Sequence, residues 1–407
     1  MVSDTRLASR AVGITGSAVD SSVGLLQRYG GNVISFGMGA AGPDAIPGAA
    51  LGELASEIFR DPSNAALNYG PTEGESALRS ALMNAMAGLG QPVREESLLI
   101  TTGGMQGLDL VCKMFLDPGD LVLTESPTYP NALVSIATYE GRVLECPTDS
   151  HGIVVDAIPD LVARAGRVPK LIYVIPNHQN PTGVSLADER RPRLIELARG
   201  YNAVILEDDP YGRLSYDGTT HPSLFQLDGG VGTVVSVNTF SKVVAPGLRV
   251  GWVLGDPDVI GRMVAARHGM DTCTNVLGQR MIAAFMANRG LDEHILELRE
   301  RYGRKLGAML RELQRNFGDE PGVEWTRPAG GFFVWLTLPG IVADELVDAA
   351  LANGVFFIPG SAFTTTSGFR DCVRLNFTYP SEREIAEGVR RLKTVYTSRR
   401  ADQRQGR

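Results

Sequence analysis

The sequence is poor in cysteine and has no excess of basic residues. Its 407 residues include four cysteines, Cys112, Cys146, Cys273 and Cys372, which form neither a CxxC pair nor a spacing typical of metal sites. We therefore expect no disulfides and no cysteine-bound metal, as in proteins of the reducing cytoplasm. The formal net charge of -7 argues against a nucleic-acid partner, because nucleic acids bind to basic surfaces.

Long hydrophobic runs are also missing. No apolar stretch reaches about 18 residues, so the sequence predicts no membrane-spanning helix. The first residues carry an acid and arginines without a hydrophobic segment, which argues against a secretory signal peptide. Hydrophobic residues make up 43% of the chain and charged residues 21%. This composition is typical of a soluble globular protein with one large or two smaller domains.

The sequence does contain a lysine in an unusual position. Residues 233–237 predict a buried strand, Lys242 follows among small hydroxyl residues, and 250–254 predict another strand. A lysine in a desolvated, cationic site loses basicity and becomes a nucleophile toward carbonyl groups. A Schiff-base lysine with an arginine nearby for a phosphate, here Arg249, is what pyridoxal 5′-phosphate (PLP) requires. The alternative is an ordinary lysine on a surface loop.

Predicted strands alternate with predicted helices through the middle of the chain. The strands are expected at 98–102, 120–125, 171–175, 203–206 and 233–237. The alternation predicts an α/β fold with a mainly parallel sheet between layers of helices. Ligands of such sheets bind at the carboxyl ends of the strands. Five candidate residues follow such ends: Gly103, Tyr129, Asn180, Asp208 and Lys242.

The side chains at these strand ends suit the ring of that cofactor. Asp208 can hold the proton of a pyridinium nitrogen, since a buried hydrogen bond to a charged group is worth about 1.5–3 kcal/mol. Asn180 and Tyr211 can hydrogen-bond the phenolic oxygen. The acids beside Asp208, Glu207 and Asp209, are expected to be solvated turn residues.

A second group of residues suits the phosphate. The helix predicted after the turn Gly103, Gly104 and Met105 offers free N–H groups at its start, where the helix dipole favours an anion. Arg249 and Thr239 follow the neighbouring strand and can bind the same group. A glycine turn of this kind is also common as a plain connection between a strand and a helix.

Several stretches together resemble one family. They are YGPTEG at 69–74, QNPTG at 179–183, EDDPY at 207–211, FSK at 240–242 with PGLR at 246–249, TRPAGG at 326–331, PG at 359–360 and VRLNF at 373–377. In this order the chain resembles fold-type I PLP enzymes of the aminotransferase class I/II family over about residues 33 to 395. The most similar group holds 2-aminoadipate and kynurenine aminotransferases and the catalytic half of MocR-type regulators.

The resemblance implies a role for each site residue. Lys242 would form the internal aldimine and transfer the proton, and Arg374 would bind the substrate α-carboxylate as a bidentate pair. Asn180 would contact both the cofactor and that carboxylate. Tyr129 would stack on the ring, and Gly39 would lie against the substrate.

The resemblance also implies the architecture and the assembly. It predicts a seven-stranded sheet between helices plus a smaller α+β domain. The expected divisions are an N-terminal segment at 1–50, a large PLP-binding domain at 51–299, a small domain at 300–395 and a flexible tail at 396–407. Tyr69 would reach the phosphate of a neighbouring subunit, which implies a homodimer with shared sites.

Three departures from the family pattern concern cofactor and substrate. Gly104 and Met105 stand where a serine and a glutamine are common, so phosphate binding would depend on backbone N–H groups. Asp20, Ser21 or Ser22 stands where aminoadipate enzymes carry an arginine, which favours a neutral or cationic substrate side chain over an acidic one. His178 stands where an aromatic or small residue is common, and is either a substrate contact or an exposed loop histidine.

Three functions are compatible with these residues. The first is an aminotransferase that moves an amino group between an L-amino acid and a 2-oxo acid. The second is a PLP enzyme of a specialised biosynthetic pathway that catalyses elimination, carbon–carbon bond formation or oxidation, on an amino acid such as S-adenosylmethionine or arginine. The third, a PLP-binding regulator, is disfavoured because only about 30 residues precede the first family strand. We expect the first.

Overall fold

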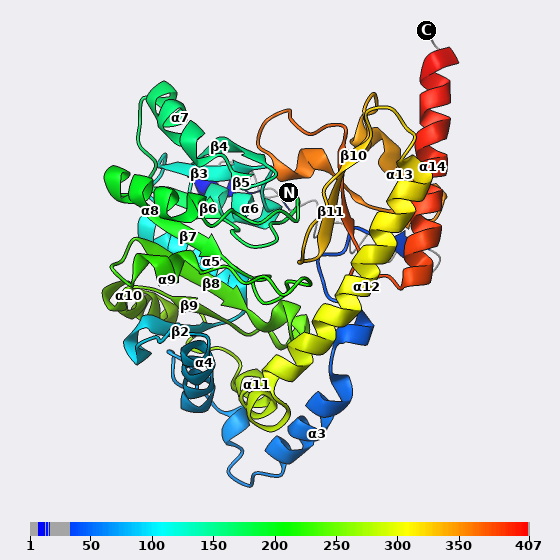
Figure 1. Cartoon of the computed structure of the whole chain (residues 1–407). Coiled ribbons are helices and arrows are strands. Elements are labelled where there is room, and N and C mark those ends of the chain that lie inside the picture. The colour runs from blue at the N-terminus through cyan, green and yellow to red at the C-terminus, as the bar shows by residue number, and fades with distance from the viewer. Residues whose placement is uncertain (1–6, 13, 15, 17–32, 406–407) are drawn as a thin grey trace.

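The computed structural model describes the whole chain except residues 1–6, 13, 15, 17–32 and 406–407. A large sheet with its covering helices forms one part of the molecule, and a smaller sheet with long helices forms the other (Figure 1). Among the described helices, none is both long enough and apolar enough to cross a membrane.

The large sheet has eight strands in the order β2-β9-β8-β7-β6-β3-β4-β5. They are β2 (Leu98–Thr101), β3 (Leu121–Ser126), β4 (Arg142–Asp149), β5 (Gly152–Ile153), β6 (Leu171–Val174), β7 (Val204–Asp208), β8 (Val234–Thr239) and β9 (Gly251–Leu254). β4, β3, β6, β7 and β8 pair in parallel, whereas β9 runs antiparallel to both β8 and β2. The sheet is therefore mainly parallel, as predicted. It exceeds the expected seven strands by the two-residue β5, which folds back on the end of β4.

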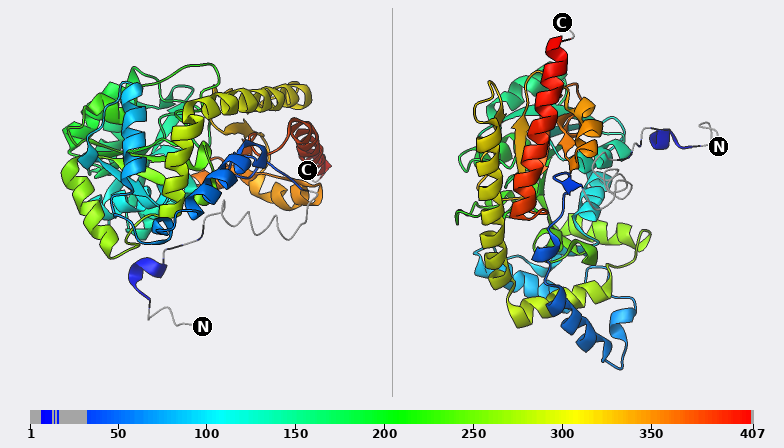
Figure 2. Two further views of the ribbon diagram at one scale, coloured as in Figure 1. Left: turned by 90° about the horizontal axis from the view of Figure 1, so that it is seen from below. Right: turned by 90° about the vertical axis from the view of Figure 1, so that its right-hand side faces the viewer.

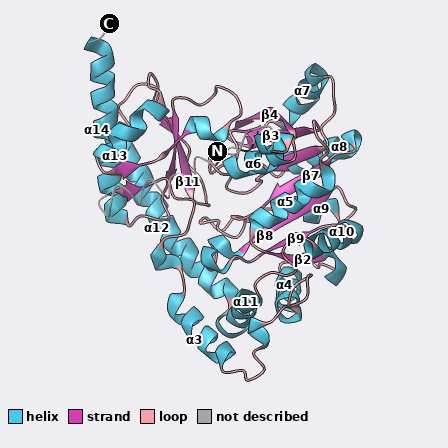
Figure 3. Ribbon diagram, turned by 180° about the vertical axis from the view of Figure 1, so that it is seen from behind, coloured by secondary structure: helices cyan, strands magenta, loops and turns pink. Residues whose placement is uncertain are grey.

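Helices cover both faces of this sheet (Figure 3). They are α4 (Ser76–Gly88), α5 (Gly104–Phe115), α6 (Pro130–Thr138), α7 (Ile158–Ala165), α8 (Arg190–Tyr201), α9 (Leu224–Asp228), α10 (Pro257–His268) and α11 (Val276–Arg289). Neighbouring residues of one strand pack into different clusters: Ile172 joins the cluster under α8, and Tyr173 joins the cluster under α5. This alternation explains why the strands are apolar throughout, since both of their faces are buried.

The smaller part contains two short sheets and several helices. Its strands are β1 (Ile34–Ser35), β10 (Glu324–Trp325), β11 (Phe333–Thr337), β12 (Val355–Phe356), β13 (Ile358–Pro359) and β14 (Cys372–Asn376). β10, β11, β14 and β13 form an antiparallel sheet in this order, and β1 pairs in parallel with β12. The helices are α12 (Leu291–Phe317), α13 (Val347–Ala352) and α14 (Glu382–Gln405).

The described residues of the N-terminal segment contact both parts, since the short α1 (Ser9–Val12) packs against α6 and β1 pairs with β12. Further on, the Phe36 N–H donates to the Phe356 carbonyl and the Phe36 carbonyl accepts from the Asn376 N–H, both at 2.7 Å. These bonds fix the glycine-rich stretch that follows, including Gly39. The chain then forms α3 (Gly48–Phe59), which packs against α11 (Figure 1).

Two expected divisions differ from the structure. α12 is a continuous helix of 27 residues that crosses the boundary expected at residue 300 (Figure 1). The tail expected at 396–407 instead continues α14 as far as Gln405, beside α12 (Figure 2). Several contacts hold these turns. Tyr396 is only 1% exposed and its ring lies 5.8 Å from that of Phe317, and Arg400 donates to the Pro339 carbonyl at 3.0 Å.

The packing of Tyr396 predicts a stability effect. Tyr396→Ala should lower the free energy of unfolding by roughly 3 kcal/mol, as expected for loss of a buried aromatic ring. Chemical denaturation of this variant and of Ser398→Ala, a change at an exposed position of the same helix, provides the comparison. Equal stability of the two variants would mean that the last turns of α14 are frayed.

Candidate active site

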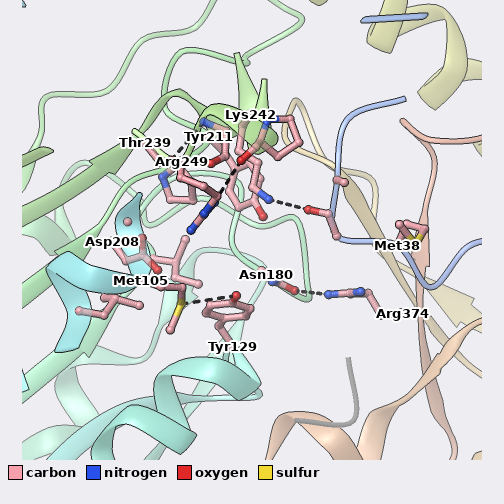
Figure 4. A pocket seen from close by; sticks show the side chains of 18 residues that line it. Met38, Met105, Tyr129, Asn180, Asp208, Tyr211, Thr239, Lys242, Arg249 and Arg374 are labelled. Atoms are coloured by element: carbon pink, nitrogen blue, oxygen red, sulfur yellow. Dashed lines mark hydrogen bonds between the residues drawn. The ribbon is translucent and has the colours of Figure 1, made fainter. Parts of the chain in front are cut away.

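The carboxyl ends of the large-sheet strands meet the N-terminal segment and β14 around one cavity of about 280 Å³ (Figure 4). Most of the site residues predicted from the sequence line it: Gly39, Gly104, Met105, Tyr129, Asn180, Asp208, Tyr211, Thr239, Lys242, Arg249 and Arg374. The two parts of the molecule therefore build this cavity jointly.

Lys242 enters the cavity from a short helical turn, Phe240–Lys242, directly after β8. Its Nζ donates a hydrogen bond of 2.5 Å to the Gly39 carbonyl (Figure 4). Burial, together with the positive charges of Arg374 and Arg249, lowers the pKa of Lys242 to about 8, although Asp208 opposes the shift. A larger share of neutral amine is therefore present near neutral pH than for an ordinary lysine, as a carbonyl nucleophile requires.

Asp208 is the last residue of β7 and is 7% exposed. Burial raises the pKa of its carboxyl to about 7, and a hydrogen bond from the Tyr173 hydroxyl opposes this rise. That hydroxyl lies 2.8 Å from Asp208 Oδ2. The sequence analysis did not single out Tyr173, because a tyrosine inside an apolar strand is typical of core packing.

The two acids beside Asp208 are not solvated turn residues, so this expectation was wrong. Glu207 is fully buried and accepts hydrogen bonds from the backbone N–H groups of Leu224 and Phe225. Asp209 accepts from the Asn177 side chain and from the Gly212 N–H. Glu207 thus binds the start of α9, and Asp209 connects the segment after β6 with the turn after β7.

Arg374 lies on β14 and is fully buried. Its Nη1 donates to Asn180 Oδ1 at 3.0 Å and its Nη2 donates to the Gly37 carbonyl at 2.7 Å. The guanidinium lies 4.2 Å from the centre of the Phe333 ring. Among the described residues, no carboxylate pairs with it and its Nε has no hydrogen-bond partner.

A buried cation without an anion is costly, so the position of Arg374 fits binding of a carboxylate from outside the chain. Burial lowers its pKa to about 10, which leaves the side chain protonated at neutral pH. Asn180 presents its oxygen to the arginine, as Figure 4 shows, and its amide nitrogen is left for another acceptor.

One end of the cavity lies where α5 begins. Gly103 has φ of 73°, and a Cβ built on it would lie 2.5 Å from Arg249 Nη2, so only glycine permits this close approach. The N–H groups at the start of α5 therefore face the same region as the Arg249 guanidinium. Thr239 donates from its hydroxyl to that of Ser241 at 2.9 Å. Ser241 also lines the cavity and was not selected from the sequence, although its position beside Lys242 was a usable signal.

Tyr129 and Tyr211 bring aromatic surface to the cavity. The Tyr129 hydroxyl lies 3.8 Å from Met105 Sδ (Figure 4), and Tyr211 is 3% exposed. Burial raises the pKa of the Tyr211 phenol, which keeps it a hydrogen-bond donor.

Among the described residues whose side chains were predicted to act in the site, His178 and Tyr69 do not line this cavity. His178 is 2% exposed, lies against Gly330 and has its Nδ1 3.3 Å from Ser185 Oγ. Burial lowers its pKa to about 4, so it is a neutral packed histidine and not an exposed loop residue. Tyr69 is 83% exposed and does not line the cavity of the single chain. Asp20 lies outside the described residues.

The residues around the cavity fit PLP. Asp208 offers a carboxylate to the ring nitrogen, Asn180 and Tyr211 offer donors to the phenolic oxygen, and Lys242 offers an amine to the aldehyde. The start of α5, with Thr239, Ser241 and Arg249, suits the phosphate. Bound there, PLP supplies an aldehyde and an electron-withdrawing ring that makes the substrate Cα–H bond acidic.

Known proteins support the same conclusion. The family model for aminotransferase class I and II matches residues 48–392. The chain is 37% identical to aromatic-amino-acid aminotransferase 1 of Thermococcus litoralis, over 94% of this chain and 92% of the relative. It is also 37% identical to 2-aminoadipate transaminase of Thermus thermophilus, over 93% of each chain.

Solved structures agree. Pyrococcus horikoshii kynurenine aminotransferase, solved in complex with PMP, superposes with a TM-score of 0.90 at 35% identity, covering 97% of this chain and 98% of that one. These relatives favour transamination over elimination, bond formation or oxidation. The chain belongs to the class I and II aminotransferases and is a PLP-dependent aminotransferase.

Proposed function

We propose that this enzyme transfers the amino group of an L-amino acid with a neutral side chain to a 2-oxo acid, with the α-carboxylate bound by Arg374. The observation that carries the proposal is the buried Arg374 guanidinium, which has no carboxylate partner among the described residues and lines the same cavity as Lys242. A carboxylate on Arg374 would direct the rest of the substrate into the cavity that Lys242 enters.

Each remaining residue then has one task. Lys242 binds the cofactor and moves the proton at Cα, because its lowered pKa suits a general base near neutral pH. Asp208 holds the proton of the ring nitrogen. Asn180 and Tyr211 bind the phenolic oxygen, and Tyr129 covers the ring. Asn180 also orients Arg374 through their 3.0 Å hydrogen bond.

The preference for a neutral side chain follows from the distribution of charge. Three cations line the described part of the cavity, Lys242, Arg249 and Arg374. Lys242 serves the amine chemistry, Arg249 the phosphate and Arg374 the α-carboxylate. None of the described cations is therefore left to pair with a second carboxylate. The apolar lining residues Met38, Leu108 and Ile175 are consistent with a neutral side chain.

The enzyme is further proposed to act as a homodimer in the cytoplasm. Tyr69 and Leu67 are 83% and 63% exposed, which is unusual for neighbouring apolar side chains and typical of a covered interface. The phenol of Tyr69 would complete the phosphate site of the partner. All four cysteines are free thiols, as in a reducing compartment.

A half-reaction tests the proposed chemistry. Purified holoenzyme mixed with single neutral L-amino acids, without any 2-oxo acid, should convert bound PLP to the pyridoxamine form and release a stoichiometric 2-oxo acid. Absorbance spectra and product quantification provide the measurement. Lys242→Ala is the control and should lose both the imine absorbance and turnover. Repeated turnover without an acceptor would contradict transamination.

The role of Arg374 predicts a selective defect. Arg374→Ala should lower kcat/KM for amino acids roughly 10²- to 10³-fold, since loss of a buried charged partner costs about 3–5 kcal/mol. Amines that lack the α-carboxylate should lose far less, because they do not use the guanidinium. Steady-state kinetics with matched amino acid and amine pairs provide the measurement. An equal loss for both substrate types would mean that Arg374 is structural.

Shared sites predict complementation between two inactive variants. Tyr69→Ala and Lys242→Ala should each be poorly active as homodimers. A hybrid dimer has one site with an intact Lys242 and the partner's intact Tyr69, so mixed and re-equilibrated subunits should recover about a quarter of wild-type activity. Unmixed variants are the control. Activity equal to the mean of the two parents would show that Tyr69 serves no neighbouring site.

A further inference from the structure

Tyr173 lies directly behind Asp208, on the core side of the cavity. Both residues face the α5 side of the sheet: Tyr173 pairs with Leu206 across β6 and β7, and Asp208 follows Leu206 by two residues on the same face. Tyr173 is fully buried, and its hydroxyl donates to Asp208 Oδ2 at 2.8 Å. The phenol therefore meets the carboxylate from the side opposite the ligand.

The two oxygens of Asp208 are in different environments. Oδ2 accepts the bond from Tyr173, whereas Oδ1 accepts no hydrogen bond from any described residue. Asp208 lines the cavity and Tyr173 does not. One oxygen is thus held by the core, and the other is left for a donor that enters with the ligand.

We propose that Tyr173 is a positioning residue that keeps the Asp208 carboxylate ionised and oriented, so that the proton between Asp208 and the cofactor stays on the ring nitrogen. This inference rests on the proposed function, because it assigns Asp208 to that nitrogen. Tyr173 itself touches neither cofactor nor substrate. It acts only through Asp208 Oδ2, which accepts its hydrogen bond.

The electrostatics of the site explain why such a donor is needed. Burial raises the pKa of Asp208 to about 7, and the charge of Asp209 adds to this rise. A carboxyl group of that basicity competes with a pyridine nitrogen for the shared proton. The Tyr173 hydrogen bond and the positive charge of Lys242 oppose the rise, and of these two only Tyr173 contacts the carboxylate directly among the described residues.

The other titratable groups near Tyr173 keep its phenol protonated. Burial raises the pKa of Tyr173 well above its usual value, and the negative charge of Asp208 acts in the same direction, as do Tyr129 and Glu125 when they are ionised. Burial also raises the pKa of Glu125 to about 8, so this carboxyl is largely neutral at pH 7. Tyr173 therefore remains a donor over the working pH range.

The test removes the donor and keeps the ring. Holoenzyme reconstituted with PLP labelled with 15N in the ring should show a pyridinium chemical shift in the wild type. In Tyr173→Phe this shift should move toward that of neutral pyridine, because a hydrogen bond to a charged group corresponds to about 1–2 pKa units. The kcat should fall roughly tenfold or more with little change in KM, and the isotope effect with Cα-deuterated substrate should rise.

Two further proteins separate this role from packing. Tyr396→Phe is the control: it removes the hydroxyl of another buried tyrosine, which accepts a hydrogen bond from Arg400 at 2.9 Å and lies on α14 away from the cavity. It should leave the 15N shift and kcat unchanged. Replacement of Tyr173 by 3-fluorotyrosine strengthens the donor with almost no change of shape, so this protein should fold even if the phenylalanine variant does not. The stronger donor lowers the basicity of Asp208 relative to the ring nitrogen, so the 15N shift should lie further from that of neutral pyridine than in the wild type.

An unchanged pyridinium shift in both Tyr173 proteins would overturn the proposal, even with a lowered kcat, because the loss would then come from packing. Such a result would leave transamination intact. In contrast, a wild-type holoenzyme that fails to form a pyridoxamine product would refute the proposed function without reference to Tyr173. The two failures are therefore distinguishable.

Discussion

The guanidinium of Arg374 connects the parts of this molecule that build the active site. It lies on β14 in the small part, donates to Asn180 in the large part, and donates to the carbonyl of Gly37 in the N-terminal segment. Both hydrogen bonds are buried, so one charged group links these three segments. Its aromatic contact with Phe333 adds favourable interaction without supplying the missing anion. The substrate carboxylate would supply that anion.

The cavity has an imbalance of charge that matches its ligands. Lys242, Arg249 and Arg374 approach the same space, and the pKa of Lys242 falls partly because the other two are positive. The described carboxylate among the lining residues is Asp208, which is buried and which we have proposed as the partner of the ring nitrogen. A dianionic phosphate and an α-carboxylate would neutralise this excess, so a cofactor and substrate of this kind would stabilise the folded site as well as react in it.

The phosphate turn shows how a family site can change without loss of its fold. Gly104 and Met105 provide no hydroxyl or amide side chain, but the N–H groups at the start of α5 remain, and Gly103 still permits the approach of Arg249. Thr239 and Ser241 add hydroxyls from the neighbouring strand end. Backbone donors at a helix start depend little on side-chain identity, which explains why these substitutions are tolerated.

Much of the architecture could be predicted from the sequence, because strands and helices follow from residue patterns within short stretches of the chain. The apolar strands alternate with helices, and this order alone indicates a mainly parallel sheet with ligands at its carboxyl ends. Lys242, Asp208, Asn180 and Arg249 follow strand ends, so their convergence could be predicted before any coordinates. Arg374 is different: its role came from resemblance, because no local pattern relates it to residues almost 200 positions away.

Tertiary contacts decided the remainder. Glu207 and Asp209 look like solvated acids in the sequence, yet Glu207 accepts from the N–H of Leu224 at the start of α9, and Asp209 accepts from the Asn177 side chain. Both donors lie far away in the sequence and reach the acids only in the folded chain. His178 packs against Gly330, and Tyr396 near the end of α14 packs against Phe317. Tyr173 on β6 donates a hydrogen bond to Asp208 on the neighbouring strand β7. The sequence by itself determined which elements form and which chemistry they carry, since both depend on local residue types. The protonation state and burial of each group depend on distant neighbours, so only the folded structure decided them.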